Sequence, residues 1–211
     1  MSDPTNPDVP VFEHRDPNSP GFWDERFGQR YTPWDQAGVP EMFKTFVASR
    51  SAQNVLIPGC SSAYEAQYLA ERGWPVRAID FARGAVEAAR KQLGAHAGLV
   101  EEADFFAYEP PFATDWVYER VLLCALPRER WQDYASRMAE VLRPGGLLAG
   151  FFRRRDAERA AVRHRSQRAR RAADGALRTG RRPREVSHSI PVFAGRARAL
   201  DDLAARLNGP A

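Results

Sequence analysis

Residues 54–65 read NVLIPGCSSAYE, and this stretch decides the fold. The apolar run at 55–57 has the length of a buried strand, and Gly59 supplies a tight turn after it. Helical spacing then continues over AYEAQYLAERG until the glycine stop at Gly73. The pattern predicts a strand, a turn and a helix, in which the turn brings backbone close to a ligand at the helix N-terminus.

The same alternation continues on both sides of this unit. A helical pattern covers 40–47, and PVRAID, LVEEADFF, WVYERVLLCAL and LLAGFF read as four further strands. RGAVEAARKQLG predicts a second helix, and a helix over 127–142 leads into a turn at RPGG. Strands that alternate with helices of this length predict an α/β fold with a Rossmann-like, doubly wound and mostly parallel sheet. The alternation stops after Phe152, and one later run, SIPVFAGR at 189–196, again resembles a strand.

Length and composition predict a globular protein of one domain with arms. The chain has 211 residues, of which 44% are hydrophobic, and no apolar run approaches the length of a membrane span. The first residues lack the apolar region of a signal peptide, and the two cysteines, Cys60 and Cys124, fall inside apolar stretches. We therefore expect reduced, buried thiols in a cytoplasmic monomer that does not associate with a membrane.

The positive charge of the chain belongs to one segment. Residues 153–186 contain 13 Arg, no Lys and four acidic residues, a local charge of +9. The rest of the chain has 31 − 13 = 18 basic and 27 − 4 = 23 acidic residues, a charge of −5. Outside this segment the sequence carries no basic footprint typical of a nucleic-acid-binding protein.

These features predict four regions. They are a flexible N-terminal arm (1–20) rich in Pro, Asp and Asn, a Rossmann-like core (21–152), the Arg-rich segment (153–186), and a last strand with an unusual tail (187–211).

The predicted ligand site lies at the carboxyl ends of the strands. Asp80 ends the second strand about 20 residues after the Gly59 turn, where its carboxylate can accept hydrogen bonds from both ribose hydroxyls of an adenosine-containing cofactor. Asp104 and Phe105 follow the third strand, in a position to flank an adenine ring. The alternative for Gly59 is an ordinary turn, and Asp80 can simply cap the next helix. The cofactor is either a nicotinamide dinucleotide or S-adenosylmethionine, although the absence of G-x-G-x-x-G weakens the dinucleotide interpretation.

Several motifs together resemble the thiopurine S-methyltransferase family, in its bacterial branch, close to the thiol and halide methyltransferases. They are FWDERF, TPWDQAGVP, VLIPGCSSAYEAQYLA, VRAIDF, ADFF, YERVLLCALP and RPGGLLAGFF. The likeness extends over about residues 11–152 and resumes over SIPVFAGR. It implies a class I S-adenosylmethionine-dependent methyltransferase that moves a methyl group to a thiol, a thiopurine or a similar small soft nucleophile, without a metal.

The resemblance also assigns roles to individual residues. It implies that an aromatic lid and a set of loop and strand-end residues bind the cofactor, namely Trp23, Phe27, Trp34, Gly59, Asp80, Asp104, Phe105 and Arg120. Arg120 is also a candidate for substrate contact, and no general base is assigned. The alternatives are ordinary core packing for the aromatic side chains and an exposed surface cation for Arg120. In-line transfer from a sulfonium needs mainly alignment and exclusion of water, which can supply about 7–11 kcal/mol.

The chain departs from the family pattern at Ser61, where close relatives carry glycine in PGCGSAYE. Glycine permits positive φ and close backbone approach, so serine there is expected to cost about 1 kcal/mol and to weaken cofactor binding.

A second departure covers the Arg-rich segment. Where relatives continue with GPPFGI, this chain reads AAVRHR, and one nucleotide sequence can encode both in different reading frames. The tail from about residue 198 can likewise encode a Trp- and Arg-rich family terminus in another frame. We therefore predict that residues 153–186, and those from about 198, are translated out of frame, so that the C-terminal strands of the fold are degraded.

Three functions remain open from the sequence. The first is an active thiol or thiopurine S-methyltransferase, and the second is an impaired or inactive relative with a damaged C-terminal part. The third is a nucleic-acid-binding protein that uses the Arg-rich segment, although a basic arm of this kind usually also contains Lys. Intact reading frames in the resequenced coding DNA would contradict the frameshift hypothesis.

Overall fold

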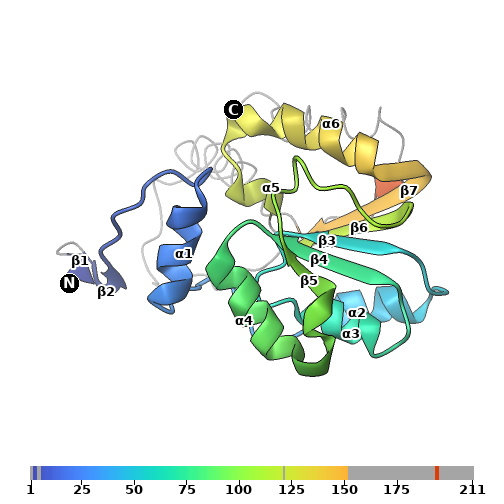
Figure 1. Ribbon diagram of the computed structural model, residues 1–211, viewed down its shortest axis with the longest axis horizontal. Coiled ribbons are helices and arrows are strands. Elements are labelled where there is room, and N and C mark those ends of the chain that lie inside the picture. Colours follow the sequence, from blue (N-terminus) through green and yellow to red (C-terminus); the bar gives the residue numbers. More distant parts are fainter. Residues whose placement is uncertain (1, 4–5, 121, 152–192, 195–211) are drawn as a thin grey trace, which may run out of the picture.

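Figure 1 shows the computed structural model of the chain, which describes residues 2–3, 6–120, 122–151 and 193–194. Its main sheet has the strand order β5-β4-β3-β6-β7-β8. Five of these strands run parallel, namely β3 (Val55–Pro58), β4 (Val76–Asp80), β5 (Val100–Glu102), β6 (Thr114–Arg120) and β7 (Leu142–Phe151). β8 (Phe193–Ala194) pairs antiparallel with β7. This confirms the predicted Rossmann-like, doubly wound and mostly parallel sheet.

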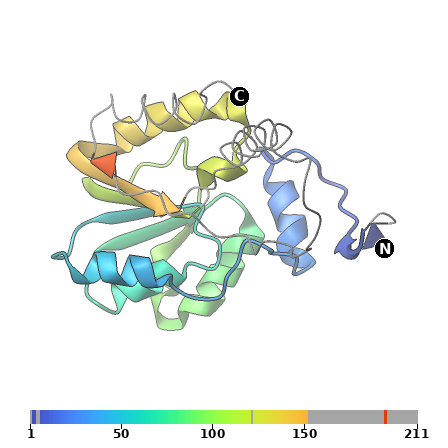
Figure 2. The same ribbon diagram turned by 180° about the vertical axis from the view of Figure 1, so that it is seen from behind.

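Helices cover both faces of the sheet (Figures 1 and 2). One face carries α2 (Glu41–Ala48), α3 (Tyr64–Ala70) and α4 (Arg83–Leu93), which is followed by the 3₁₀ turn η1 (Gly94–Leu99). The other face carries α5 (Leu122–Ala125), the 3₁₀ turn η2 (Arg128–Arg130) and α6 (Trp131–Val141). Trp116 and Tyr118 of β6 pack in the core on the α2–α3 side, and Val117 packs with Tyr134 on the α6 side. The alternation of side chains along β6 therefore contributes to two separate cores.

The strand order places the topological switch point at β3 and β6. The chain moves from β3 outward to β4 and β5, then returns to β6 on the other side of β3. Ligands of doubly wound sheets bind where the connections diverge in this way, at the carboxyl ends of the strands. The turn that follows β3 and the end of β6 therefore border the expected site.

The predicted fourth strand was too long. We expected a strand through WVYERVLLCAL, but β6 ends at Arg120 and α5 begins at Leu122. The Leu123 amide donates to Glu119 Oε2 (3.2 Å), so the Glu119 carboxylate caps the first turn of α5. A continuous apolar run does not distinguish a buried strand from a short buried helix, and here this side-chain contact marks the boundary.

Two other boundaries differ from the predictions. The third strand is confined to Val100–Glu102, and the ADFF residues follow it as a loop. The predicted turn at RPGG lies inside β7, where the register against β6 shifts and Gly145 has a φ of +80°. Glycine tolerates this φ without steric cost, so the glycine that we expected in a turn instead forms an irregularity within the strand.

The second half of the predicted N-terminal arm contacts α1 (Pro20–Gly28). The Glu13 and His14 amides donate to the two carboxylate oxygens of Glu25 (2.8 and 3.0 Å), and Phe12 is buried with its ring 5.4 Å from that of Tyr31. Before it, β1 (Ser2–Asp3) and β2 (Asn6–Pro10) form a separate antiparallel pair.

The Arg-rich segment 153–186 and the tail from about residue 198 lie outside the described residues. Of the strand-like run at 189–196, Phe193–Ala194 forms β8. Within the described part of the chain, no helix is both long and apolar enough to cross a membrane.

Candidate functional site

The loop between β3 and α3 requires an unusual backbone. Gly59 has a φ of +62°, and a Cβ added there would lie 2.9 Å from Leu122 Cδ1, so this position needs glycine for two reasons. Ser61 (φ +48°) and Ala63 (φ +54°) are also left-handed although neither is glycine. Left-handed conformations of such residues cost about 1 kcal/mol or more each, and they cluster at ligand-binding sites. The strain expected from the sequence at Ser61 is therefore present in the loop.

Asp80 connects this loop to the end of β4. Its Oδ2 accepts a hydrogen bond from the Ser61 amide (3.1 Å), and its Oδ1 accepts one from the Ala82 amide (3.1 Å). Burial raises the pKa of Asp80 to about 6, and the nearby Asp24 carboxylate adds to this effect. An ionised carboxylate can accept about four hydrogen bonds, so Asp80, which the Ser61, Ala82 and Phe81 amides approach, retains acceptor capacity for a ligand.

The three aromatic residues predicted as a lid form one cluster beside the loop. The Trp34 ring lies 5.5 Å from that of Trp23 and 5.8 Å from that of Phe27, both in edge-to-face orientation. Trp34 Nε1 donates to Ser61 Oγ (3.2 Å), which connects this cluster directly to the β3–α3 loop.

The helix α1, which carries Trp23 and Phe27, is attached to the start of α4, because Asp24 Oδ1 accepts a hydrogen bond from the Gly84 amide (2.7 Å).

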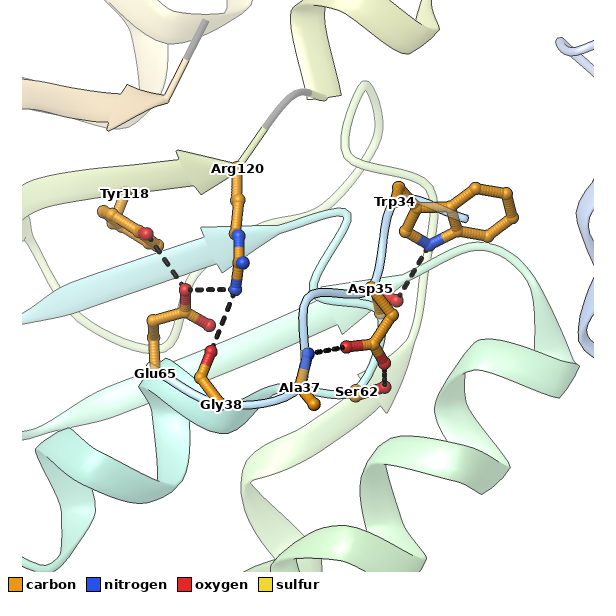
Figure 3. Close-up of polar contacts among 9 residues, drawn as sticks. Trp34, Asp35, Ala37, Gly38, Ser62, Glu65, Tyr118 and Arg120 are labelled. Atoms are coloured by element: carbon orange, nitrogen blue, oxygen red, sulfur yellow. Dashed lines mark hydrogen bonds and ion pairs between the residues drawn. The ribbon is translucent and has the colours of Figure 1, made fainter. Parts of the chain in front are cut away.

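A buried carboxylate lies on the opposite side of the loop, between α3 and β6. Glu65 Oε1 accepts from the Tyr118 hydroxyl (3.0 Å) and from Arg120 Nη1 (3.2 Å), and the same Arg120 nitrogen donates to the Gly38 carbonyl (3.1 Å) (Figure 3). Burial raises the pKa of Glu65, whereas the positive charge of Arg120 lowers it. Burial and the Glu65 charge raise the pKa of Tyr118 in turn.

The sequence reasoning missed Glu65, although the sequence contained a signal. Glu65 lies on the buried side of α3 together with Ala66 and Leu69. Glutamate is rarely buried unless it is paired, so a charged residue on an apolar helix face indicates a partner elsewhere in the fold. The partner, Arg120, is 55 residues further along the chain.

Residues of the β3–α3 loop, the buried Glu65 and the end of β6 line a small pocket whose empty space, about 420 Å³, includes the open solvent at its mouth. Three of the predicted site residues line it, namely Trp34, Gly59 and Arg120. Asp80 contacts the loop that forms one wall, through the Ser61 amide. Trp23 and Phe27 contact Trp34 but do not themselves line the pocket.

Asp104 and Phe105 do not line this pocket in the described structure. Phe105 is 6% exposed, and its ring packs against Phe106 and Tyr134 in the core below α6. Asp104 is exposed, and its Oδ1 accepts from the Phe106 amide (3.0 Å). Their contact with an adenine ring stays a prediction.

Comparisons with known proteins agree with the resemblance read from the motifs. Residues 18–153 match the family described as thiopurine S-methyltransferase (TPMT). Thiocyanate methyltransferase 1 of Brassica oleracea is 29% identical over 135 residues, which are 61% of this chain and 59% of the relative. Thiopurine S-methyltransferase of Vibrio cholerae is 26% identical over 148 residues, which are 61% of this chain and 67% of the relative.

The matches cover only part of these relatives. The chain spans about three fifths to two thirds of the length of the curated proteins it matches. A solved structure that concerns the conversion of a disulfide bond into a thioacetal group during echinomycin biosynthesis has a TM-score of 0.49 and 27% identity, over 57% of this chain and 51% of that one. Since the family match extends over well over half of the chain, the chain belongs to the thiopurine S-methyltransferase family.

Proposed function

We propose that this chain transfers a methyl group from S-adenosylmethionine to a thiol or another small soft nucleophile, such as a thiopurine, by direct in-line displacement. The observation that carries the proposal is the pocket at the switch point of the sheet. The strained β3–α3 loop forms one of its walls, and Arg120 lies at the end of β6. The family match makes methyl transfer the expected chemistry of such a pocket.

S-adenosylmethionine is the cofactor of this family, and the residues present fit it. Asp80, at the end of β4, would hold the ribose hydroxyls with its remaining acceptor capacity. Gly59 presents only backbone to the pocket, and Trp34 supplies an apolar wall. When bound, the cofactor supplies a methyl group already activated by its positively charged sulfur.

The pocket favours an acceptor that arrives ionised. Among the described residues, two carboxylates line it, and both already accept hydrogen bonds: Asp35 from the Ser62 hydroxyl (2.6 Å), and Glu65 from Tyr118 and Arg120. Burial raises the pKa of the Cys60 thiol, which makes it a poor acid-base group. Among the described residues that line the pocket, Arg120 is the one cation, so it would orient a negatively charged sulfur with the guanidinium donors that Glu65 and the Gly38 carbonyl do not use. A thiopurine or another acidic thiol meets this requirement without a protein base.

The direct test is a methyl-transfer assay across thiopurines, small thiols, thiocyanate, halides, a phenol and an amine. We expect turnover with the sulfur acceptors and a rate that rises with the fraction of thiolate. Methylation of only the phenol or the amine would overturn the proposal. The Asp80→Asn variant serves as the control for cofactor-dependent signal.

A second candidate is a protein that binds the cofactor but turns over slowly or not at all. The left-handed backbone at Ser61 supports it, and so does the predicted frame change over 153–186. Titration calorimetry that detects S-adenosylmethionine binding, combined with no turnover on any acceptor, would select this candidate. Resequencing of the coding DNA then tests the frame change independently.

A further inference from the structure

Trp34 and Asp35 line the pocket, and the segment 34–38 that begins with them is fastened at both ends (Figure 3). At its start, the Trp34 indole donates to Ser61 Oγ and the Ser62 hydroxyl donates to Asp35 Oδ2. At its end, the Gly38 carbonyl accepts from Arg120 Nη1 (3.1 Å). The first attachment uses the β3–α3 loop and the second uses β6, so the two can be disturbed separately.

The second attachment depends on Glu65, which makes no hydrogen bond to the described residues of the segment itself. The Glu65 side chain is only 6% exposed, and its Oε1 accepts hydrogen bonds from both Arg120 Nη1 and the Tyr118 hydroxyl. The Arg120 side chain is 23% exposed, so its charge is partly withdrawn from water and needs a counter-charge. Glu65 is the one ion-pair partner of Arg120 among the described residues, so its loss would remove the carboxylate that now pairs with the guanidinium.

We propose that Glu65 is a positioning residue for the methyl-transfer site. It holds the Arg120 guanidinium at the end of β6, in the orientation that both fastens segment 34–38 through the Gly38 carbonyl and presents Arg120 to the acceptor. This inference rests on the proposed function only for the role of Arg120 toward the acceptor. Its structural part, the fastening of segment 34–38, stands without it.

Hydrogen–deuterium exchange of the full chain without ligand tests the structural part. The Glu65→Gln variant retains the shape of the side chain but loses its charge. We expect amides at 36–39 to exchange about tenfold faster than in the parent, which is the range for loss of one charge-assisted hydrogen bond. The matched control is Glu87→Gln, which removes an exposed pair with Arg83 (2.9 Å) on α4 and should leave these amides unchanged.

A double-mutant cycle then distinguishes positioning from simple packing. Arg120→Gln should accelerate the same amides, and Glu65→Gln added to Arg120→Gln should accelerate them little further, because Glu65 acts through Arg120. Additive effects would overturn the proposal, as would unchanged exchange in Glu65→Gln. If Glu65→Gln does not fold, Glu65→Asp serves instead. It retains the negative charge, but its side chain is one methylene shorter and holds Arg120 less well, so we expect the same faster exchange.

Steady-state kinetics with an ionised thiol test the functional part. Glu65→Gln is expected to raise KM for the acceptor about tenfold with a smaller change in kcat, since a misplaced Arg120 weakens acceptor binding. A fall in kcat with KM unchanged would contradict this part. If no acceptor is methylated, the proposed function fails, whereas the exchange cycle still decides the role of Glu65.

Discussion

Replacement of Glu119 by glutamine tests how much one buried carboxyl group determines the stability of this fold. Glu119 lies on β6 and is fully buried, facing the core under α6. Its Oε2 caps α5 through the Leu123 amide, and the carboxyl group also faces the buried Tyr134 hydroxyl. Burial raises its pKa from the ordinary 4.5 to about 8, although the backbone amides of Leu123 and Leu122 act in the opposite direction.

The sign of the pH effect follows from the raised pKa. The protonated form fits the folded protein, so the contribution of Glu119 to stability is complete below pH 4.5 and is lost as the pH rises toward 8. Each pH unit in this window corresponds to about 1.4 kcal/mol. At pH 7 the unfolded chain is ionised and the folded chain mostly is not, so the loss amounts to about 3 kcal/mol. Glutamine is uncharged and can still accept from the Leu123 amide, so it avoids this loss.

The measurement is urea denaturation of the parent and Glu119→Gln at pH 5, 6, 7 and 8. The stability of the variant relative to the parent should rise by about 2–3 kcal/mol between pH 5 and pH 7, with m-values unchanged. Glu87→Gln on the exposed face of α4 is the control and should follow the parent at every pH. Parallel curves for Glu119→Gln and the parent would refute the reasoning.

Three further predictions concern the β3–α3 loop and Asp80. Since burial raises the pKa of Asp80 to about 6, the affinity for S-adenosylmethionine should fall as the pH drops from 7.5 to 5. The Asp80→Asn variant should bind about tenfold more weakly and should show no such fall. Titration calorimetry of both proteins at the two pH values checks both expectations. Gly59→Ala should lose about 1–3 kcal/mol of stability, because the added Cβ would clash with Leu122. The control is Gly73→Ala, where φ is also positive (+74°) but no atom lies within 4 Å of the added Cβ, so its loss should be smaller. Equal losses would disprove the clash. Ser61→Gly removes a left-handed serine and should tighten S-adenosylmethionine binding; equal affinities in calorimetry would show that the strain does not reach the cofactor.

The sequence was most informative where the relevant interactions are local. The strand, turn and helix of residues 54–73 follow from hydrophobic periodicity and glycine placement, and the structure contains β3, the turn and α3 there. Asp80 could be placed at the end of a strand because the spacing of one βαβ unit fixes its position relative to the turn. Ser61 was identified as a strained position because the family motif that this stretch resembles carries glycine there, and its φ of +48° agrees.

The tertiary structure decided what depends on contacts between distant segments. Phe105 follows a strand end as predicted, yet its ring lies in the core against Tyr134 because α6 packs over it. The end of β6 at Arg120 is set by the cap that Glu119 provides to α5, which an apolar run cannot reveal.

The sequence predicted the alternation of the core strands β3–β7 with α3, α4 and α6, the turn at Gly59 and the acid at position 80, because each depends on residues within one unit. Only the tertiary structure brought Glu65, Arg120 and Gly38 together, across separations of 55 and 82 residues. A periodic pattern shows which face of a helix or strand is buried. It does not show which distant residue pairs with a buried charge, because that depends on β6 lying next to β3 in the sheet.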